Sequence, residues 1–479
     1  MAETDIFFLP VKDVCSKEVI TCAPDDGLMS VAGIMREKNI SSVVVCENGA
    51  PTGIVTDRDL RNKVVARGDA PRSVAVRTIM NAPLITVGEE DFLFEALYRM
   101  SRHGIHRVGV VDVTGKLTGI VTDSDVLRLQ TRSPQRMIRD IEEADTVEEL
   151  KSLHARVQGL VLHLVGTGAA TRDLVRMIAL LNDRILLRLI ALLRKERFPH
   201  LPEGFAFVVL GSEGRREQTL ATDQDNAIIL ADGLSGEEMA MIEDFSRELI
   251  DSLIAIGVPS CPGGIMAKNV EWRRSVKDWT HCLDDWFSNA TPENILKGSM
   301  FLDLRALWGD SALEKTLKAH IAANLHRNAA FLAHMGANVL RFPPPLGWFG
   351  RIKTEKRGKH RGQFDVKKAG IFAVTEGVKV LALENGFLEG GTRERLQHLG
   401  RIGVLDRQAA EDLEATFDFL VFMRLRAQVT AIRAGREPSN FISLDHLNRM
   451  EKGRLQLALE GVKSFQGFLK RHFRLEHLH

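Results

Sequence analysis

Apolar and polar positions follow two different periods along the chain, and these periods predict its elements. In the first third, apolar runs rich in β-branched residues at 40–45 and 105–111 each precede a glycine-containing turn and a second apolar run. This pattern predicts two strand hairpins. Before each hairpin, at 28–39 and 92–104, apolar residues recur at helical spacing and predict an amphipathic helix. The first third is therefore an internal repeat.

Helical and strand patterns alternate in the rest of the chain. Apolar residues recur at a helical period over 174–198, until Pro199 and Pro202 end the pattern. Two apolar runs then predict buried strands at 205–210 and 226–230. The remainder is helical in pattern, with long helices expected at 313–342, 370–387, 415–435 and 453–473. We therefore expect an α/β (α+β) multidomain protein with a C-terminal helical bundle.

The two copies of the repeat share the segment Gly-Ile-Val-Thr-Asp-x-Asp, at 53–59 and 119–125. Its spacing places Thr56 and Thr122 at strand ends, with Asp59 and Asp125 at helix N-termini. A hydroxyl and a carboxylate beside free backbone N–H groups bind a ribose and a phosphate. Helix capping alone also explains the two aspartates. Both interpretations stay open at this point.

This repeat resembles a tandem CBS pair over about residues 10–130. The resemblance implies two units related by a pseudo-twofold axis, around a central cleft that holds adenine nucleotides in some members. It also implies that Thr56, Asp59, Thr122 and Asp125 contact the ribose. Such pairs commonly associate face to face, so the resemblance implies a homodimer.

A second group of polar residues lies between the two predicted strands, in the sequence GSEGRREQTLATDQD at 211–225. Asp223 and Asp225 are two positions apart at the start of a strand, so their side chains share one face. Two such carboxylates repel each other unless a cation lies between them, and hard oxygen ligands suit Mg²⁺. Gly211-Ser212 lets the backbone approach a phosphate, and Arg215 and Arg216 supply positive charge. An isolated Asp-x-Asp is common in solvated loops, but this ordered set favours a nucleotide site.

The same ordered set resembles the nucleotidyltransferases of the DNA polymerase β superfamily. More closely, it resembles family members that carry CBS or cyclic-nucleotide-binding modules, relatives of the PII-protein uridylyltransferase. The resemblance runs from about Asp145 to the C-terminus and includes segments 261–272 and 301–310. It implies a third metal-binding carboxylate, for which Asp303 is the candidate. An Asp303–Arg305 structural pair is the alternative, and Asp284 and Asp285 are competing carboxylates.

A basic segment interrupts the C-terminal helices. Between Arg351 and Lys368 there are eight Lys/Arg and two Asp/Glu residues. The segment is either a solvated face or a surface that screens a triphosphate or an acidic acceptor. The basic residues proposed for that screening are Lys353, Lys356, Arg357, Lys359 and Arg361. The resemblance also implies that Asp365 and Lys367 face the nucleotide site.

Composition narrows the classes of function. Lys+Arg 64 against Asp+Glu 63 gives a net charge of +1, which argues against a protein that coats nucleic acid. The five cysteines form no CxxC pair, which favours a reducing compartment. The acidic N-terminus does not resemble a signal peptide, and no apolar stretch approaches the roughly twenty residues of a membrane span. We therefore expect a cytoplasmic protein without membrane contact.

These observations predict four regions: a CBS pair at 1–132, a helical linker region at 133–200, a nucleotidyltransferase domain at 201–315 and a helical domain at 316–479. The expected reaction is Mg²⁺-dependent transfer of a nucleoside monophosphate from an NTP to an acceptor, which the resemblance implies is a protein. The CBS pair would regulate it by binding adenine nucleotides. The alternatives are a non-catalytic nucleotide-sensing regulator and a nucleotidyltransferase acting on RNA 3′ ends.

Overall fold

The computed structural model describes residues 9–47, 49–125, 134–166, 170–325, 327–347 and 350–477. Its internal contacts divide the chain into two compact units, Met1–Arg136 and Met137–His479. The N-terminal boundary therefore lies close to the predicted one, whereas the predicted linker region at 133–200 falls almost entirely within the second unit. Within the described residues, no helix is long and apolar enough to cross a membrane.

The first unit contains the two copies of the predicted repeat, each with a three-stranded sheet and its own small core. In each copy the first strand pairs parallel to the second, and the second pairs antiparallel to the third. The first copy consists of β1 (Thr21–Cys22), α1 (Leu28–Lys38), β2 (Ser42–Glu47), β3 (Ala50–Thr56) and α2 (Asp57–Lys63). The second copy contains β4 (Thr86–Gly88), α3 (Leu93–His103), β5 (Arg107–Val111) and β6 (Leu117–Thr122). The predicted hairpins and helices are confirmed.

The second unit is built on a four-stranded sheet of order β10-β7-β8-β9. Its strands are β7 (Phe205–Val209), β8 (Asn226–Leu230), β9 (Arg273–Ser275) and β10 (Arg305–Gly309). β7 pairs antiparallel with both β10 and β8, while β8 and β9 are parallel. Every residue of β7 and β8 is buried, as expected for continuous apolar runs that are covered on both faces.

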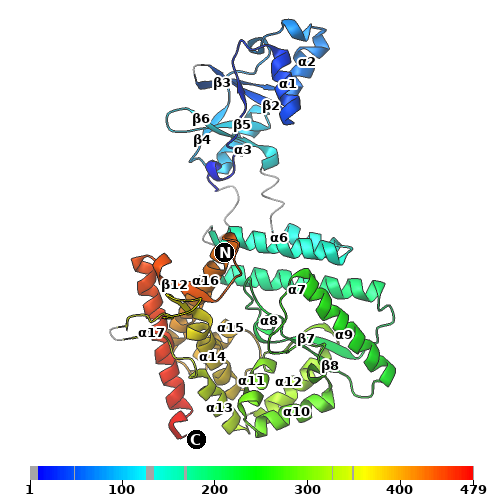
Figure 1. Ribbon diagram of the computed structural model, residues 1–479, viewed down its shortest axis with the longest axis vertical. Helices are drawn as coiled ribbons and strands as arrows, with labels where there is room; N and C mark the ends of the chain where they lie inside the picture. The colour runs from blue at the N-terminus through cyan, green and yellow to red at the C-terminus, as the bar shows by residue number, and fades with distance from the viewer. Residues whose placement is uncertain are drawn as a thin grey trace. The chain divides into compact units, whose positions relative to one another are not determined.

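Helices cover both faces of this sheet (Figure 1). Phe205, Phe207 and Val209 pack into a core with α6 (Val147–Gly166), α7 (Thr171–Glu196) and α9 (Gly236–Ile256). The alternate residues of the same strand, Ala206 and Val208, pack into another core on the opposite face. This second layer contains α10 (Val276–Ser288), α11 (Pro292–Phe301) and α12 (Ser311–Leu325), and α5 (Pro134–Glu143) adds to the first. The helices predicted as a linker are therefore one layer packed against this sheet.

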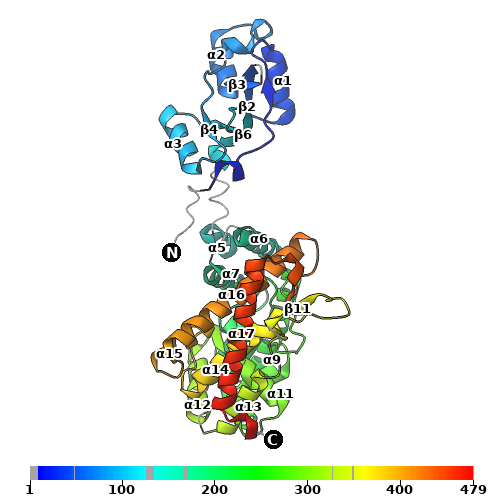
Figure 2. The same cartoon turned by 90° about the vertical axis from the view of Figure 1, so that its left-hand side faces the viewer.

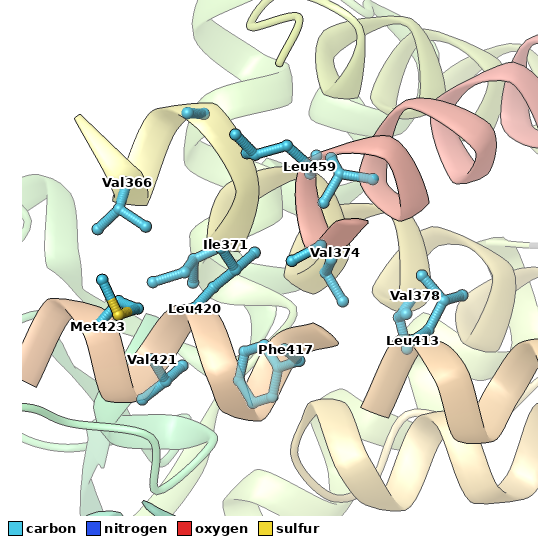
Figure 3. Packing of buried hydrophobic residues seen from close by; sticks show 14 of the residues in the cluster. Val366, Ile371, Val374, Val378, Leu413, Phe417, Leu420, Val421, Met423 and Leu459 are labelled. Carbon is cyan, nitrogen blue, oxygen red and sulfur yellow. The ribbon is translucent and has the colours of Figure 1, made fainter. Parts of the chain in front are cut away.

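The C-terminal helices form a separate core that includes a short two-stranded sheet. Leu420 and Phe417 of α16 pack against Val374 and Val378 of α14 (Figure 3). In Figure 2 α17 extends along this group of helices, and it contacts both α14 and α16. The helices are α13 (Ala329–Val339), α14 (Phe372–Glu384), α15 (Thr392–Arg401), α16 (Arg407–Arg433) and α17 (Arg449–His472). The two antiparallel strands are β11 (Gln363–Asp365) and β12 (Phe441–Ser443). The predicted helical domain is confirmed.

One predicted helix is wrong in its length. The pattern over 313–342 predicts a single helix, but α12 ends at Leu325 and α13 begins at Ala329. Asparagine side chains interrupt it: Asn328 Nδ2 donates to the Asn324 carbonyl and Asn324 Nδ2 to the His320 carbonyl. Such side chains compete with the helical backbone for its acceptors. Periodicity alone does not detect this break because both helices pack apolar residues into the same core.

Candidate active site

Asp223 and Asp225 lie where the chain enters β8. The Asp225 carbonyl accepts from the Leu210 N–H at 2.8 Å, which joins this entry to the end of β7. Gln224 between them is buried, whereas Asp223 is exposed and Asp225 is half-buried. Because neighbouring side chains in extended backbone point to opposite faces, the two carboxylates share one face and interact electrostatically.

Burial and nearby charges both shift the pKa of Asp225. Burial raises it from the ordinary value of 3.8 to about 6. A hydrogen bond from the Cys261 thiol lowers it, as do the charges of Lys367 and Arg215, while Asp223 raises it further. These stabilising contacts do not offset burial and the Asp223 charge, so the pair would gain from a bound cation.

The signature turn, Gly211–Glu217, begins beside this acid pair. Gly211 adopts φ +52, which L side chains rarely adopt. A Cβ at this position would lie 3.3 Å from Asp225 Oδ2 and 2.7 Å from the Met300 methyl carbon. Glycine therefore lets the backbone lie directly against the carboxylate, and half-buried Ser212 follows it in the short helix α8 (Gly211–Gly214). The structure brings the predicted Gly-Ser turn and the Asp-x-Asp pair together.

The C-terminal helical domain supplies two cations to this pair. Lys367, at the start of a π-helical turn after β11, interacts electrostatically with Asp225 and Asp223. Protein packed around its ammonium lowers the pKa of Lys367, and the Arg424 charge lowers it further. Asp365, two residues earlier, accepts from the Lys368 N–H and acts on Arg424.

Arg424 of α16 is a site residue that the sequence did not indicate. Its Nη2 donates to the Ala221 carbonyl at 3.3 Å, and its Nε donates to Asn440 Oδ1 at 2.7 Å. Burial lowers its pKa to about 10, whereas the charges of Asp365 and Asp223 raise it. Nothing in the α16 sequence separates this arginine from the others on that helix, because only tertiary packing brings it to the acid pair.

The prediction that Asp303 is the third metal-binding carboxylate is wrong. Asp303 lies in the turn between α11 and β10, and its side chain has no exposed surface. Its carboxylate forms ion pairs with Arg215, with Lys379 at 2.8 Å and with Arg395 at 2.7 Å. Burial raises the pKa of Asp303, but these three cations outweigh burial and hold the pKa well below its ordinary value. A carboxylate so enclosed has no position left for a metal ion.

The other residues considered with Asp303 have different partners. Arg305 pairs with Asp183 at 2.9 Å, so the Asp303–Arg305 pair does not form. Asp284 pairs with His320, and Asp285 accepts from Asn289, both on the exposed side of α10. Across the described ranges, no group of three or more His, Cys, Asp or Glu residues is arranged to hold a metal ion.

Arg215 and Arg216 have different positions. The Arg215 guanidinium is nearly buried; its Nε donates to Glu217 Oε2 at 2.8 Å, and it acts electrostatically on Asp225. Glu217 in turn accepts from the Thr392 N–H and hydroxyl on α15. Arg216, predicted to bind nucleotide, is 63% exposed, and its Nε lies 4.0 Å from Asp183 Oδ2. It is not among the principal charges that act on Asp225.

In the first unit, both copies of the repeat show helix capping. Thr56 Oγ1 donates to Asp59 Oδ2 at 2.6 Å, and the Asp59 N–H donates back to Thr56 Oγ1. Thr122 and Asp125 make the same bonds, at 2.7 Å and 3.2 Å. Asp59 and Asp125 are only 6% and 4% exposed. The capping interpretation is confirmed, and ribose contact by these residues stays a prediction.

A groove of about 770 Å³ lies between α16 and the β11–β12 strands of the C-terminal helical domain. Asn440, which holds Arg424, is part of its wall, as are the stacked rings of His360 and Phe441, whose centroids are 3.6 Å apart. The basic segment reaches the groove at Lys359. The exposed cations of this segment make no ion pair with any described residue; they are Arg351, Lys353, Lys356, Arg357, Lys359 and Arg361.

Family models match most of the chain. A CBS domain model matches 11–66 and 76–132, a model described as "Putative nucleotidyltransferase DUF294" matches 155–293, and one described as "Putative nucleotidyltransferase substrate binding domain" matches 329–473. The chain belongs to the family described as "Putative nucleotidyltransferase DUF294", in a form that carries a CBS pair. The substrate-binding model of this family spans Lys367, Arg424 and the groove.

Similar individual proteins match about a quarter of the chain. "Uncharacterized protein MK0525" of Methanopyrus kandleri is 44% identical over 25% of the chain and 62% of its own length. The inosine-5'-monophosphate dehydrogenase of Mycobacterium tuberculosis is 37% identical over 23% of the chain and 20% of its own length. The solved CBS domain pair of MJ0100, in complex with 5-methylthioadenosine and S-adenosyl-L-methionine, is 31% identical over 26% of the chain and 96% of its own length, with a TM-score of 0.24.

The Asp303 cluster predicts a stability defect. Asp303→Asn leaves three buried cations without their shared counter-charge, so we expect the second unit to lose about 3–5 kcal/mol of unfolding free energy. Urea unfolding followed by tryptophan fluorescence measures this directly, because all five tryptophans lie after residue 137. Asp244→Asn, at an exposed position on α9, is the matched control. Unchanged stability would contradict the structural role.

Because Glu213 of the signature turn is buried, we expect the free energy of unfolding to depend on pH. Burial raises its pKa from 4.5 to about 8, the charges of Asp225 and Asp183 raise it further, and Arg305 opposes them. The folded chain therefore keeps a proton that the unfolded chain releases above pH 4.5, so stability falls as pH rises from about 4.5 to 8. In the wild-type protein, the free energy of unfolding should fall by on the order of a few kcal/mol between these pH values, and Glu213→Gln should abolish this fall.

Urea unfolding at pH 5, 6.5 and 8 tests this, with exposed Glu237→Gln as the control. If the free energy of unfolding changes equally with pH in the wild-type protein and in Glu213→Gln, then Glu213 does not keep a proton in the folded state.

Proposed function

We propose that this protein is a Mg²⁺-dependent nucleotidyltransferase that transfers a nucleoside monophosphate from an NTP to an acceptor hydroxyl. The observation that carries the proposal is the acid pair, Asp223 and Asp225, placed against the Gly211 turn and facing Lys367 and Arg424. Carboxylates that need a cation, next to ammonium and guanidinium groups that need an anion, suit a metal–triphosphate complex.

In the proposed reaction, the acceptor oxygen bonds to the α-phosphorus and the bond to the β-phosphate bridging oxygen breaks, releasing pyrophosphate. Bound Mg²⁺ would neutralise phosphate charge and lower the pKa of the acceptor hydroxyl. Asp223 and Asp225 would hold the metal, and Lys367 and Arg424 would stabilise the charge that develops on the leaving pyrophosphate. With Asp303 excluded, these two cations take a larger share of charge stabilisation.

Gly211 and Ser212 would grip the triphosphate through the backbone of the signature turn. Arg215 would act as a positioning residue, because it ties that turn to Asp303 and Glu217 while it acts on Asp225. This arrangement fixes the geometry between turn and acid pair before substrate arrives.

The acceptor would be a protein, as in the uridylyltransferases that this chain resembles, and the groove beside Arg424 is the place for it. The unpaired cations of the basic segment suit an acidic surface. The four labelled NTPs, each incubated with Mg²⁺ and a cell lysate, would show which nucleotide is used. Protease and ribonuclease treatment of the labelled product would then distinguish a protein acceptor from RNA.

The CBS pair would bind adenine nucleotides and adjust this activity. The family model supports the pair itself, and both copies carry the same Thr–Asp capping motif at the end of their hairpins.

If the acid pair is catalytic, removing one of its charges should reduce turnover. Asp223→Asn should reduce NTP turnover by at least about a hundredfold, because it removes a metal-binding charge. Pyrophosphate release measures turnover, and an unchanged urea midpoint shows that the variant is folded. Asp244→Asn, with the same change at an exposed helical site, should keep full activity. Turnover within twofold of wild type in Asp223→Asn would remove the metal assignment.

If Asp59 of the CBS pair contacts a ribose, removing its charge should weaken AMP binding. Asp59→Asn keeps a helix-capping side chain but removes the charge, so AMP affinity measured by calorimetry should fall by about tenfold if Asp59 contacts a ribose. Asp69→Asn, an exposed position in the same unit, is the control. Equal affinities would show that Asp59 serves the helix cap alone.

A further inference from the structure

The second unit contains another cavity, of about 610 Å³, that the proposed reaction does not use. Gly214 to Glu217 of the signature turn form part of its lining, together with α7, the start of β10 and residues 388–395. Neither Asp223 nor Asp225 lines it. The cavity and the acid pair therefore share the signature turn but have separate walls.

The acidic residues in the lining already have partners. Asp183 pairs with Arg305 at 2.9 Å, Glu217 pairs with Arg215 at 2.8 Å, and Asp303 is enclosed by its three cations. Glu314 and Glu389 both pair with Lys318, and Glu394 accepts from the Gly391 N–H. These carboxylates are thus engaged before any further cation is considered.

The lining holds eight Arg and Lys residues against six Asp and Glu residues, and three of its arginines have a long ion pair or none. Arg172 and Arg176 are exposed on one face of α7, four positions apart, and neither makes an ion pair with a described residue. Arg216 has only Asp183 within 4.0 Å, and that carboxylate is closer to Arg305. The cavity therefore presents an excess of positive charge.

The guanidinium groups of Arg172, Arg176 and Arg216 are exposed donors in the lining. Guanidinium groups match the oxygens of phosphates, often in pairs of hydrogen bonds.

We propose that this cavity binds a small molecule with adjacent phosphate groups, such as inorganic pyrophosphate or the polyphosphate part of a nucleotide. Three exposed arginines suit several negative charges better than one phosphate does, and the volume falls in the range of small-ligand sites. Arg215 lines the cavity and also acts on Asp225, so an anion bound here changes the field at the acid pair. Binding itself does not depend on the proposed reaction.

Calorimetric titration of the full chain with pyrophosphate, in EDTA and low salt, tests the proposal. We expect saturable binding that Arg172→Glu, Arg176→Glu and Arg216→Glu each weaken by roughly tenfold or more. Lys195→Glu makes the same charge reversal at an exposed position on α7 outside the cavity, and should leave affinity within twofold. Absence of saturable binding, or affinity that the three arginine substitutions leave unchanged, overturns the proposal.

Competition between pyrophosphate and nucleotides shows whether the cavity also binds the polyphosphate part of a nucleotide. In an Asp59→Asn/Asp125→Asn background, ATP should displace pyrophosphate, and AMP should not. Equal displacement by AMP would overturn the requirement for adjacent phosphates. Asp223→Asn separates this site from the proposed reaction, because turnover should be lost while pyrophosphate binding in EDTA is kept. Loss of that binding would place pyrophosphate at the acid pair and overturn the second site.

Discussion

The buried ion cluster around Asp303 holds the second unit in its working arrangement. One carboxylate, with no exposed surface, joins Arg215 of the signature turn to Lys379 of α14 and Arg395 of α15. Removing charges from water is expensive, so such a cluster persists only when every member is paired. The cluster therefore holds the signature turn against the C-terminal helical domain, which also contains Lys367 and Arg424.

Burial then determines the chemistry of the neighbouring acids. Asp225 and Glu213 lie close to each other in the same turn region, and burial raises the pKa of both, to about 6 and about 8. Asp303 is buried more completely, yet its pKa is lowered, because three cations surround it. The difference lies in whether the protein itself supplies the counter-charge. Where it does, the buried carboxylate stays ionised; where it does not, burial raises the pKa of the carboxylate.

The same reasoning distinguishes the polar sites of the two units. In the first unit, Thr56, Asp59, Thr122 and Asp125 satisfy each other within two capping motifs. In the second unit, Arg172, Arg176 and Arg216 face a cavity whose acidic residues are already engaged. Counting partners for each charged group therefore distinguishes charges that the protein itself pairs from charges that it leaves exposed.

The sequence by itself determined every feature that depends on neighbours along the chain. Periodicity identified the repeat, the two buried strands and most helices, and spacing placed Gly211, Asp223 and Asp225 together because adjacent strands bring their connections side by side. Only tertiary structure decided the role of Asp303 and the contribution of Arg424. These depend on which distant side chains provide a counter-charge or an acceptor, and no local pattern encodes that choice.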